Sequence, residues 1–292
     1  MPVKSRCLGI LAVVSCLLVS AKCGVAANQP LNVMSFNIRF DNPADGFDNW
    51  KFRARHVAAM FKEHQVDAGG LQEVKHHQLV WLQQALPEYQ FVGVGRDDGK
   101  EKGEYAPVFF RKSEFDLLKT QTIWLSEMPE VVGSKGWDAA LPRIATLSVL
   151  RHKKSDTKVL LGNTHYDHRG VEARKKSAAV IHEYLAKLRK EFGTPVVLLT
   201  GDFNCLPGSA PFKAVEVAND LVDAYKLADQ RVGPDSTWSG FRAVEPGRRI
   251  DYVFTRKGTS VRKHVIDDKQ VNGRFPSDHL PVIVQIQWEG KN

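Results

Sequence analysis

The stretch Val196-Val197-Leu198-Leu199-Thr200-Gly201-Asp202-Phe203-Asn204 decides the fold. Residues 196–200 form a continuous apolar run, which is typical of a strand covered on both faces. Asp202 and Asn204 follow at a spacing of two, so both side chains can point the same way. A buried strand that ends in acid and amide groups indicates an α/β domain with a pocket at the sheet edge.

Five further motifs repeat this arrangement, because each ends or closely follows an apolar run. They are Ser35-Phe36-Asn37, Leu71-Gln72-Glu73-Val74, Asn163-Thr164-His165, Arg249-Ile250-Asp251-Tyr252 and Ser277-Asp278-His279. Each motif alone is weak, but the fixed order of the whole set makes chance occurrence improbable. Loops at strand ends can converge on one pocket, so we expect these oxygen ligands and imidazoles to meet there.

Hydrophobic periodicity supports this class of fold. It predicts strands over residues 31–40, 68–74, 91–94, 108–110, 143–151, 158–165, 196–200, 249–255 and 280–288. It also predicts helices over 50–64, over 79–86 and along 178–192, and a helix entered at Ser209 and Pro211 with Val215, Leu221 and Leu227 among its apolar positions. Strands outnumber helices, and hairpins mix with crossovers. This pattern predicts two packed mixed sheets with helices outside, in one domain over residues 28–292.

The first 27 residues are predicted to be a signal peptide. Lys4 and Arg6 form a basic start, and the apolar stretch 8–19 is too short to span a bilayer comfortably. Small residues at 25–27 suit cleavage after Ala27. A lipoprotein signal ending at Cys16 is the alternative. We therefore expect an exported protein, periplasmic or extracellular, with no stable membrane span.

Composition sets further bounds on the protein. Cys7, Cys16 and Cys23 lie in the predicted signal peptide, so only Cys205 remains and no internal disulfide can form. Removing that segment, which has three basic residues and no acid, lowers the net charge from +8 to +5. A mildly basic balance suits an anionic partner such as a phosphate ester, and ordinary surface charge explains it equally well. We expect a monomer.

The residue types indicate the chemistry. Phosphate-ester cleavage needs a divalent cation, a polarised attacking water and donors that stabilise developing charge. Magnesium prefers oxygen ligands and needs only one or two carboxylates, which Glu73 and Asn37 fit. Asp202 could align or deprotonate the water, while Asn204 donates to a phosphate oxygen. His279 needs an acidic partner, and Asp251 is the candidate.

Together these motifs resemble the endonuclease/exonuclease/phosphatase superfamily, which includes deoxyribonuclease I, and the resemblance covers residues 28–292. It is strongest to secreted bacterial hydrolases with an Asn-Thr-His-x-Asp-His motif, here 163–168. The resemblance implies a four-layer α/β sandwich of two mixed sheets flanked by helices. It also implies hydrolysis that depends on Mg²⁺ or Mn²⁺.

The resemblance also implies roles for individual residues. It makes Glu73 the main metal carboxylate, with Asn37 and Asp278 nearby. The implied catalytic residues are Asp202, Asn204, His165, His279, Asp251 and Tyr105. The implied substrate contacts are Arg143, Arg174 and Arg39. Arg39 departs from AP endonucleases, which carry an acid there, so a second metal ligand at this position is in doubt.

Several functions remain open at this stage. The leading hypothesis is a metal-dependent phosphohydrolase that acts on nucleic acid or a soluble phosphodiester, with a phospholipid, sphingomyelin or inositol phosphate as alternatives. Candidates to line a basic nucleic-acid channel are Lys51, Arg53, Arg55, Arg248 and Arg249. A non-catalytic binding module on the same scaffold is disfavoured because Glu73, Asp202 and His279 are all present. A two-carboxylate glycosidase would leave the histidines and amides unexplained.

Overall fold

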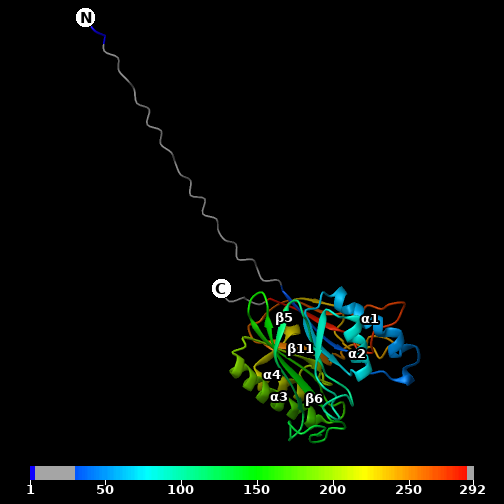
Figure 1. Ribbon diagram of the computed structural model, residues 1–292. Helices are drawn as coiled ribbons and strands as arrows, with labels where there is room; N and C mark the ends of the chain where they lie inside the picture. Colours follow the sequence, from blue (N-terminus) through cyan, green and yellow to red (C-terminus); the bar gives the residue numbers. More distant parts are fainter. Residues whose placement is uncertain (4–29, 288–292) are drawn as a thin grey trace.

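The protein consists of two mixed β-sheets that face each other, with helices on both outer faces. The computed structural model describes residues 1–3 and 30–287, apart from the side chains of residues 218 and 219. Helices α1 and α2 lie on one side of the body, and α3 and α4 lie on the opposite side, with the sheets between them (Figure 1). This four-layer arrangement confirms the predicted fold class.

The first sheet has seven strands in the order β10-β12-β13-β1-β2-β4-β3. Their bounds are Ala228–Val232, Ser260–Ile266, Val282–Gln287, Leu31–Asn37, Ala68–Gln72, Val108–Arg111 and Tyr89–Val92. The central strand β1 pairs parallel with β2 and antiparallel with β13. This pairing brings the C-terminal strand of the chain beside its first strand, so residues near both ends of the chain can contribute to one site.

The second sheet has six strands in the order β5-β6-β7-β8-β11-β9. Their bounds are Phe115–Trp124, Ile144–His152, Lys158–His165, Val196–Asp202, Asp251–Arg256 and Leu221–Asp223. Strand β8 is the decisive apolar run; it pairs parallel with β7 and antiparallel with β11. The predicted hairpin between residues 143–151 and 158–165 is present as the β6–β7 pair.

Three hydrophobic layers hold the sandwich together. Helices α1 (Trp50–Glu63) and α2 (His76–Ala85) pack on the outer face of the first sheet. Helices α3 (Val171–Phe192) and α4 (Ala210–Asn219) pack on the outer face of the second sheet. Between the sheets, side chains such as Val33, Leu161 and Leu198 form a common core. Both faces of β8 are therefore covered, as its apolar composition predicts.

A buried polar network also joins the two sheets. The Gln72 side-chain amide donates to Asn163 Oδ1 at 2.6 Å, and Thr200 Oγ1 donates to the same oxygen at 3.0 Å. Asn163 in turn donates to the backbone carbonyl of Leu71 at 2.6 Å. Ser35 Oγ accepts from the Gly201 amide at 3.0 Å. Because buried polar groups need defined partners, these contacts set how β1 and β2 align with β7 and β8.

The helix that begins after Ser209 is shorter than predicted. It ends at Asn219, and Asp220 adopts a left-handed conformation with φ of 50°. Leu221 therefore lies in the short strand β9, and Leu227 lies in the separate helix α5 (Ala224–Leu227). Strands β5, β9, β10 and β12 were not predicted. Residues 4–27 of the predicted signal peptide, with its three cysteines, and Trp288 lie outside the described residues.

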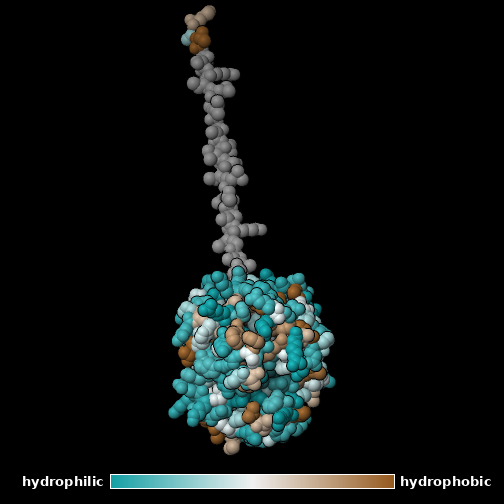
Figure 2. All heavy atoms as spheres, turned by 90° about the vertical axis from the view of Figure 1, so that its right-hand side faces the viewer, coloured by the Kyte–Doolittle hydropathy of each residue, from teal (hydrophilic) through white to brown (hydrophobic). Residues whose placement is uncertain are grey.

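The molecular surface seen from the α1 and α2 side is mainly hydrophilic, with apolar residues scattered among polar ones (Figure 2). The exposed aromatic side chains Phe47 and Phe52 stack on each other, with ring centroids 6.0 Å apart. Within the described residues, every helix is too short or too polar to cross a bilayer.

Candidate active site

The register of the second sheet places three predicted site residues side by side. His165 at the end of β7 is the registered neighbour of Asp202 at the end of β8. Asp251 at the start of β11 is the neighbour of Asp202 on the other side. Parallel pairing of β7 with β8 and antiparallel pairing of β11 with β8 bring these ends to one edge of the sheet. Local strand geometry thus builds half of the site.

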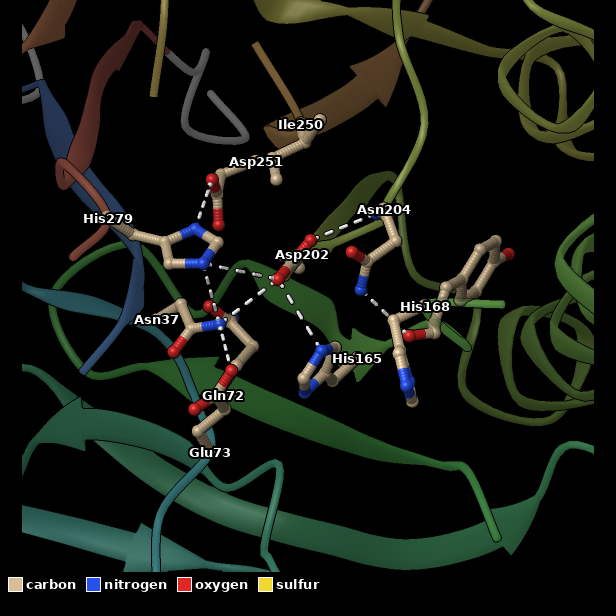
Figure 3. A network of polar contacts seen from close by, with 12 residues as sticks. Asn37, Gln72, Glu73, His165, His168, Asp202, Asn204, Ile250, Asp251 and His279 are labelled. Carbon is tan, nitrogen blue, oxygen red and sulfur yellow. Dashed lines mark hydrogen bonds and ion pairs between the residues drawn. The ribbon is translucent and has the colours of Figure 1, made fainter. Parts of the chain in front are cut away.

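The first sheet delivers Asn37, which contacts three other site residues. Its Nδ2 lies 3.1 Å from Glu73 Oε1, 3.0 Å from Asp202 Oδ2 and 3.3 Å from His279 Nε2. Asn37 ends β1, and Glu73 directly follows β2, its parallel neighbour. The facing edges of the two sheets therefore bring together residues separated by up to 242 positions in the sequence (Figure 3).

Two non-glycine residues of the site have positive φ angles that are unusual for their types. They are Arg39 with φ of 56° and Glu73 with φ of 61°. Such angles are uncommon outside glycine and asparagine, and they persist only where the surroundings hold them. The Glu73 carboxylate is held by the Phe40 amide at 3.1 Å in addition to Asn37. These two hydrogen bonds therefore hold the direction of the Glu73 carboxylate.

His279 is fully buried and paired with Asp251. Its Nδ1 lies 2.9 Å from Asp251 Oδ2, and its Nε2 lies 3.7 Å from Asp202 Oδ2. Burial disfavours the charged ring, but the carboxylates of Asp251 and Asp202 outweigh it and raise the pKa of His279 to about 10. The ring of Trp238 packs edge-on against it, with centroids 4.7 Å apart. His279 is therefore an oriented cation at neutral pH.

Asp202 lies at the centre of the cluster. Burial, followed by the negative charge of Asp251, raises the pKa of its carboxyl to about 7, although His279 opposes the shift. Its Oδ1 accepts a hydrogen bond from the backbone amide of Asn204 at 2.9 Å. The Asn204 side chain donates to the Tyr166 carbonyl at 3.0 Å, which leaves its second amide hydrogen free for another acceptor. A carboxyl with a pKa near neutrality is suited to proton transfer.

His165 is the neutral counterpart of His279. Burial and the guanidinium groups of Arg143 and Arg96 hold the pKa of His165 well below its usual range. Its Nε2 lies 3.4 Å from Asp202 Oδ2, and its Nδ1 is buried without a hydrogen-bond partner among the described residues. The ring can therefore donate a hydrogen bond while it stays uncharged.

Glu73 is part of an acidic group that lacks a fully compensating charge. Burial, then Asp278 and Glu104, raise the pKa of its carboxyl. Arg39 lies 3.9 Å from Glu73 Oε2 and 3.7 Å from Asp278 Oδ2. However, its guanidinium is bound in bidentate fashion to Asp45, at 3.0 and 3.1 Å. Arg39 is thus held within the acidic group rather than projecting freely toward a substrate.

The structure places the remaining predicted residues around this centre rather than in it. Arg143 is buried, pairs with Asp167 at 3.2 Å and contacts His168 Nδ1 at 2.9 Å. Arg174 donates to the Asp167 carbonyl at 2.8 Å. The Tyr105 hydroxyl lies 3.0 Å from His76 Nδ1 and donates to the Lys100 carbonyl at 2.7 Å. These side chains hold the loops around the cluster.

Glu104 is a site residue that the sequence analysis did not single out. Its carboxylate lies 3.9 Å from His165 Nδ1 and is bound by Arg96 at 2.7 and 3.1 Å. The surrounding segment is rich in charge and glycine and reads as an exposed loop. The only sequence signal was its position beside Tyr105. Together with Arg143 and His165, these residues line a cavity of about 10 Å³, the size of one water molecule.

The prediction of a basic nucleic-acid channel is wrong for two of its five residues. Arg53 is 3% exposed, and its guanidinium donates to the backbone carbonyls of Asp48, Ile38, Arg39 and Pro276. Arg249 is 6% exposed and pairs with the buried Asp223 at 2.7 Å. Both cations are therefore engaged by other segments of the protein and cannot meet a phosphate backbone.

Cys205 packs in the hydrophobic core, whereas the histidines that follow Glu73, His76 and His77, are at least partly exposed. Cys205 is buried in the core beneath α3 and α4, and burial raises the pKa of its thiol to about 12, so it is not a nucleophile. His77 is exposed and pairs with Asp41, and His76 is partly exposed.

The fold and the cluster together define a phosphoester hydrolase of the deoxyribonuclease I-like class, and comparison with known proteins agrees. The sequence profile of the Endonuclease/Exonuclease/phosphatase family matches residues 34–279, from just before Asn37 to His279 itself. The chain therefore belongs to this family. No curated protein shows a significant sequence match.

Solved structures give a more specific comparison. An endonuclease/exonuclease/phosphatase from Bacteroides vulgatus is 37% identical, with 90% of this chain and 100% of that chain covered and a TM-score of 0.84. A mannosyl-6-phosphatase from Bacteroides thetaiotaomicron is 36% identical, with 88% and 100% covered and a TM-score of 0.84. The human Nocturnin catalytic domain, at 20% identity, with 89% and 95% covered and a TM-score of 0.68, shares the fold.

Proposed function

We propose that the protein is a Mg²⁺- or Mn²⁺-dependent hydrolase that releases phosphate from a small phosphate ester. One observation carries this proposal. The amide of Asn37 lies within 3.3 Å of Glu73, Asp202 and His279, which are a carboxylate, a proton-transfer group and a cation. These are the three chemical functions that phosphate-ester cleavage requires, and they meet at one point.

The residues present fit a hard divalent cation. Burial, then the negative charges of Asp278 and Glu104, raise the pKa of Glu73, and a bound cation would relieve this repulsion. Potential ligand atoms of Glu73, His165 and Asp202 lie within 4.8 Å of one another. Glu73 would hold the ion, with Asn37 and Asp278 nearby. The cation would neutralise phosphate oxygens and lower the pKa of a water.

Asp202 is the residue we assign to the attacking water. Its pKa near 7 lets it exist as a carboxylate and take up a proton at neutral pH. Its Oδ1 accepts from the backbone amide of Asn204, whereas Oδ2 faces the other site residues, and we assign Oδ2 as the oxygen that would accept the proton. Asn37, His165 and His279 surround Oδ2 at 3.0, 3.4 and 3.7 Å, and these contacts hold it in place.

Three donors are placed to stabilise negative charge on the phosphate group. His279 supplies a positive charge fixed by Asp251, because the pair holds both its protonation and its orientation. His165 supplies a neutral donor, and Asn204 supplies the free hydrogen of its amide. Preorganised donors need not reorganise as charge develops, and this is the basis of their catalytic effect.

The nature of the substrate follows from what surrounds the cluster. A nucleic-acid substrate is disfavoured because Arg53 and Arg249 are buried and engaged elsewhere. The 36% identical mannosyl-6-phosphatase acts, by its name, on a phosphomonoester. Both observations favour a small phosphate ester over the nucleic acid or soluble phosphodiester that the sequence alone favoured.

The experiment is a metal and substrate panel with the purified protein. Phosphate release from hexose 6-phosphates, nucleotides and inositol phosphates is measured alongside cleavage of bis-p-nitrophenyl phosphate and plasmid DNA. Each is assayed with Mg²⁺, with Mn²⁺ and with excess EDTA. We expect ester hydrolysis that EDTA abolishes and added Mg²⁺ restores. Full turnover in EDTA, or no hydrolysis of any ester, would contradict the proposal.

We also propose that the protein is exported after cleavage following Ala27 and that it acts as a monomer. The basic start, the short apolar stretch and the small residues at 25–27 support export. Mass spectrometry of the protein recovered from the cell exterior or periplasm tests the cleavage site. Light scattering tests the oligomeric state.

A further inference from the structure

We propose that a cavity beside Asn204 binds the alcohol part of the substrate and selects a compact, polyhydroxylated, non-aromatic group such as a hexose. This inference rests on the proposed phosphoesterase function and names the substrate class of the same site. The cavity has a volume of about 760 Å³, which lies within the range of small-molecule sites.

The position of the cavity suits the alcohol side of an ester. Asn204 and His168 line the cavity and also border the catalytic cluster. In the close-up view, both lie on one side of Asp202, whereas Asn37 and Glu73 lie on the other (Figure 3). The ester oxygen of a phosphate group bound beside Asp202 would therefore be able to extend toward Asn204 and His168 and into the cavity.

The walls of the cavity combine charged groups with apolar surface. Glu245 and Arg248 form an ion pair of 2.7 Å on one wall, and both remain substantially exposed. Arg174 also lines the cavity; one nitrogen of its guanidinium donates to the Asp167 carbonyl, and its Nε is buried without a hydrogen-bond partner among the described residues. Carboxylate and guanidinium groups bind hydroxyls strongly because hydrogen bonds to charged groups exceed neutral ones in strength.

Apolar side chains supply the complementary surface. Leu206 lines the cavity with 48% of its surface exposed, and Ile250 and Pro211 lie on the same lining. A sugar ring presents hydroxyl groups at its edge and C–H groups on its faces. A cavity that offers both charged groups and apolar side chains matches both parts of such a ring.

The same lining argues against nucleotide substrates. The cavity lining includes no Phe, Tyr or Trp among the described residues, so the imidazole of His168 is the one aromatic ring of this lining that a nucleobase would meet. The lining therefore favours a compact alcohol with several hydroxyls over a nucleoside.

The test is a substitution that fills the cavity without touching the catalytic cluster. Leu206→Trp adds bulk to the cavity, and Glu245→Gln keeps the shape of the wall but removes its charge. Leu118→Trp is the matched control, because Leu118 is 38% exposed on the edge strand β5 and does not line the cavity. KM and kcat are measured for hexose 6-phosphates and for a nucleoside 5′-monophosphate. The inhibition constant of inorganic phosphate reports on the phosphate site alone.

We expect the wild-type protein to prefer a hexose 6-phosphate over the nucleotide. Leu206→Trp should raise KM for the hexose phosphate by about tenfold or more, and Glu245→Gln by about tenfold, the equivalent of one charged hydrogen bond. The inhibition constant of inorganic phosphate should stay within about twofold, and Leu118→Trp should behave as wild type.

The outcomes separate the two proposals. If the wild-type protein hydrolyses phosphate esters but prefers nucleotides, or if Leu206→Trp leaves KM for hexose phosphates unchanged, the cavity assignment is wrong and the phosphoesterase function stands. If Leu206→Trp weakens the binding of inorganic phosphate as strongly as the binding of hexose phosphate, the cavity is not a separate subsite and the assignment also fails. If the wild-type protein hydrolyses no ester, both proposals fail.

Discussion

The Nδ1 atom of His279 lies 2.9 Å from Oδ2 of Asp251, and both side chains are almost fully buried. A buried imidazole in this position keeps its proton because Asp251 stabilises the cation. Asp251 is itself placed by the β8–β11 register opposite Asp202. The pair therefore acts as one unit, in which Asp251 sets the charge and direction of His279.

Non-additivity tests this pairing. Asp251→Asn should lower kcat by about ten- to a hundredfold, because the partner that orients the ring is lost. His279→Ala should lower it by at least as much, and the double variant should be no worse than His279→Ala alone. Strictly additive losses in the double-mutant cycle would rule out the pairing. Thermal unfolding of all three variants checks that each is folded.

Removal of the Glu73 charge should affect metal binding more than folding. Glu73→Gln is nearly isosteric and relieves repulsion with Asp278 and Glu104, so the melting temperature should not fall. The Mg²⁺ concentration for half-maximal activity should rise by about tenfold or more, since a carboxylate is a far stronger ligand than an amide. Mn²⁺ binding measured by calorimetry gives a readout independent of turnover.

Glu101→Gln serves as the control for that experiment, because its side chain is 72% exposed and belongs to a neighbouring loop. If Glu73→Gln and Glu101→Gln bind Mn²⁺ equally well, Glu73 is not the principal ligand.

Substitution of Arg53 tests whether this buried cation stabilises the fold instead of lining a nucleic-acid channel. Arg53→Ala leaves four buried or partly buried carbonyls without their donor, so we expect unfolding free energy to fall by about 3 kcal/mol or more. Arg55→Ala, two residues along the same helix and exposed, should change it by less than about 0.5 kcal/mol. Denaturant unfolding measures both. Equal small effects would mean that Arg53 is a surface cation after all.

These cases show what sequence can and cannot predict. The strand 196–202 and the motifs at strand ends are local patterns, so the fold class followed from periodicity and spacing. Arg53 and Arg249 sit in locally basic segments and look like surface charges. Their burial depends on Ile38, Pro276 and Asp223, which reach them only in the folded chain. Glu104 escaped notice for the same reason, since His165 meets it through tertiary structure.

The burial of His264 predicts that the stability of the protein depends on pH. Its ring is buried on β12 against Tyr225, neither nitrogen has a hydrogen-bond partner among the described residues, and burial, with Arg249 and Arg231, lowers its pKa to about 3. In the unfolded chain the imidazole has a pKa of about 6.5. Above that pH the ring is neutral in both states. As pH falls toward 3, only the unfolded state takes up the proton, so stability is lost.

His264→Phe removes this titration while it keeps a ring against Tyr225. The stability of the variant relative to wild type should therefore grow as pH falls from about 7 to 5, by an amount on the order of a kcal/mol or more. Unfolding curves at several pH values measure the difference. A constant difference between pH 7 and 5 would show that His264 is solvated or paired.

The assignment of Asp202 as the residue that handles the attacking water is the central claim, and the turnover of Asp202→Asn tests it most directly. The variant keeps the shape of the side chain at the end of β8 but cannot accept a proton. With saturating Mg²⁺, we expect kcat to fall by about a hundred- to ten-thousandfold, with the melting temperature and the inhibition constant of inorganic phosphate largely preserved. Near-normal turnover by the folded variant would contradict the assignment and the mechanism built on it.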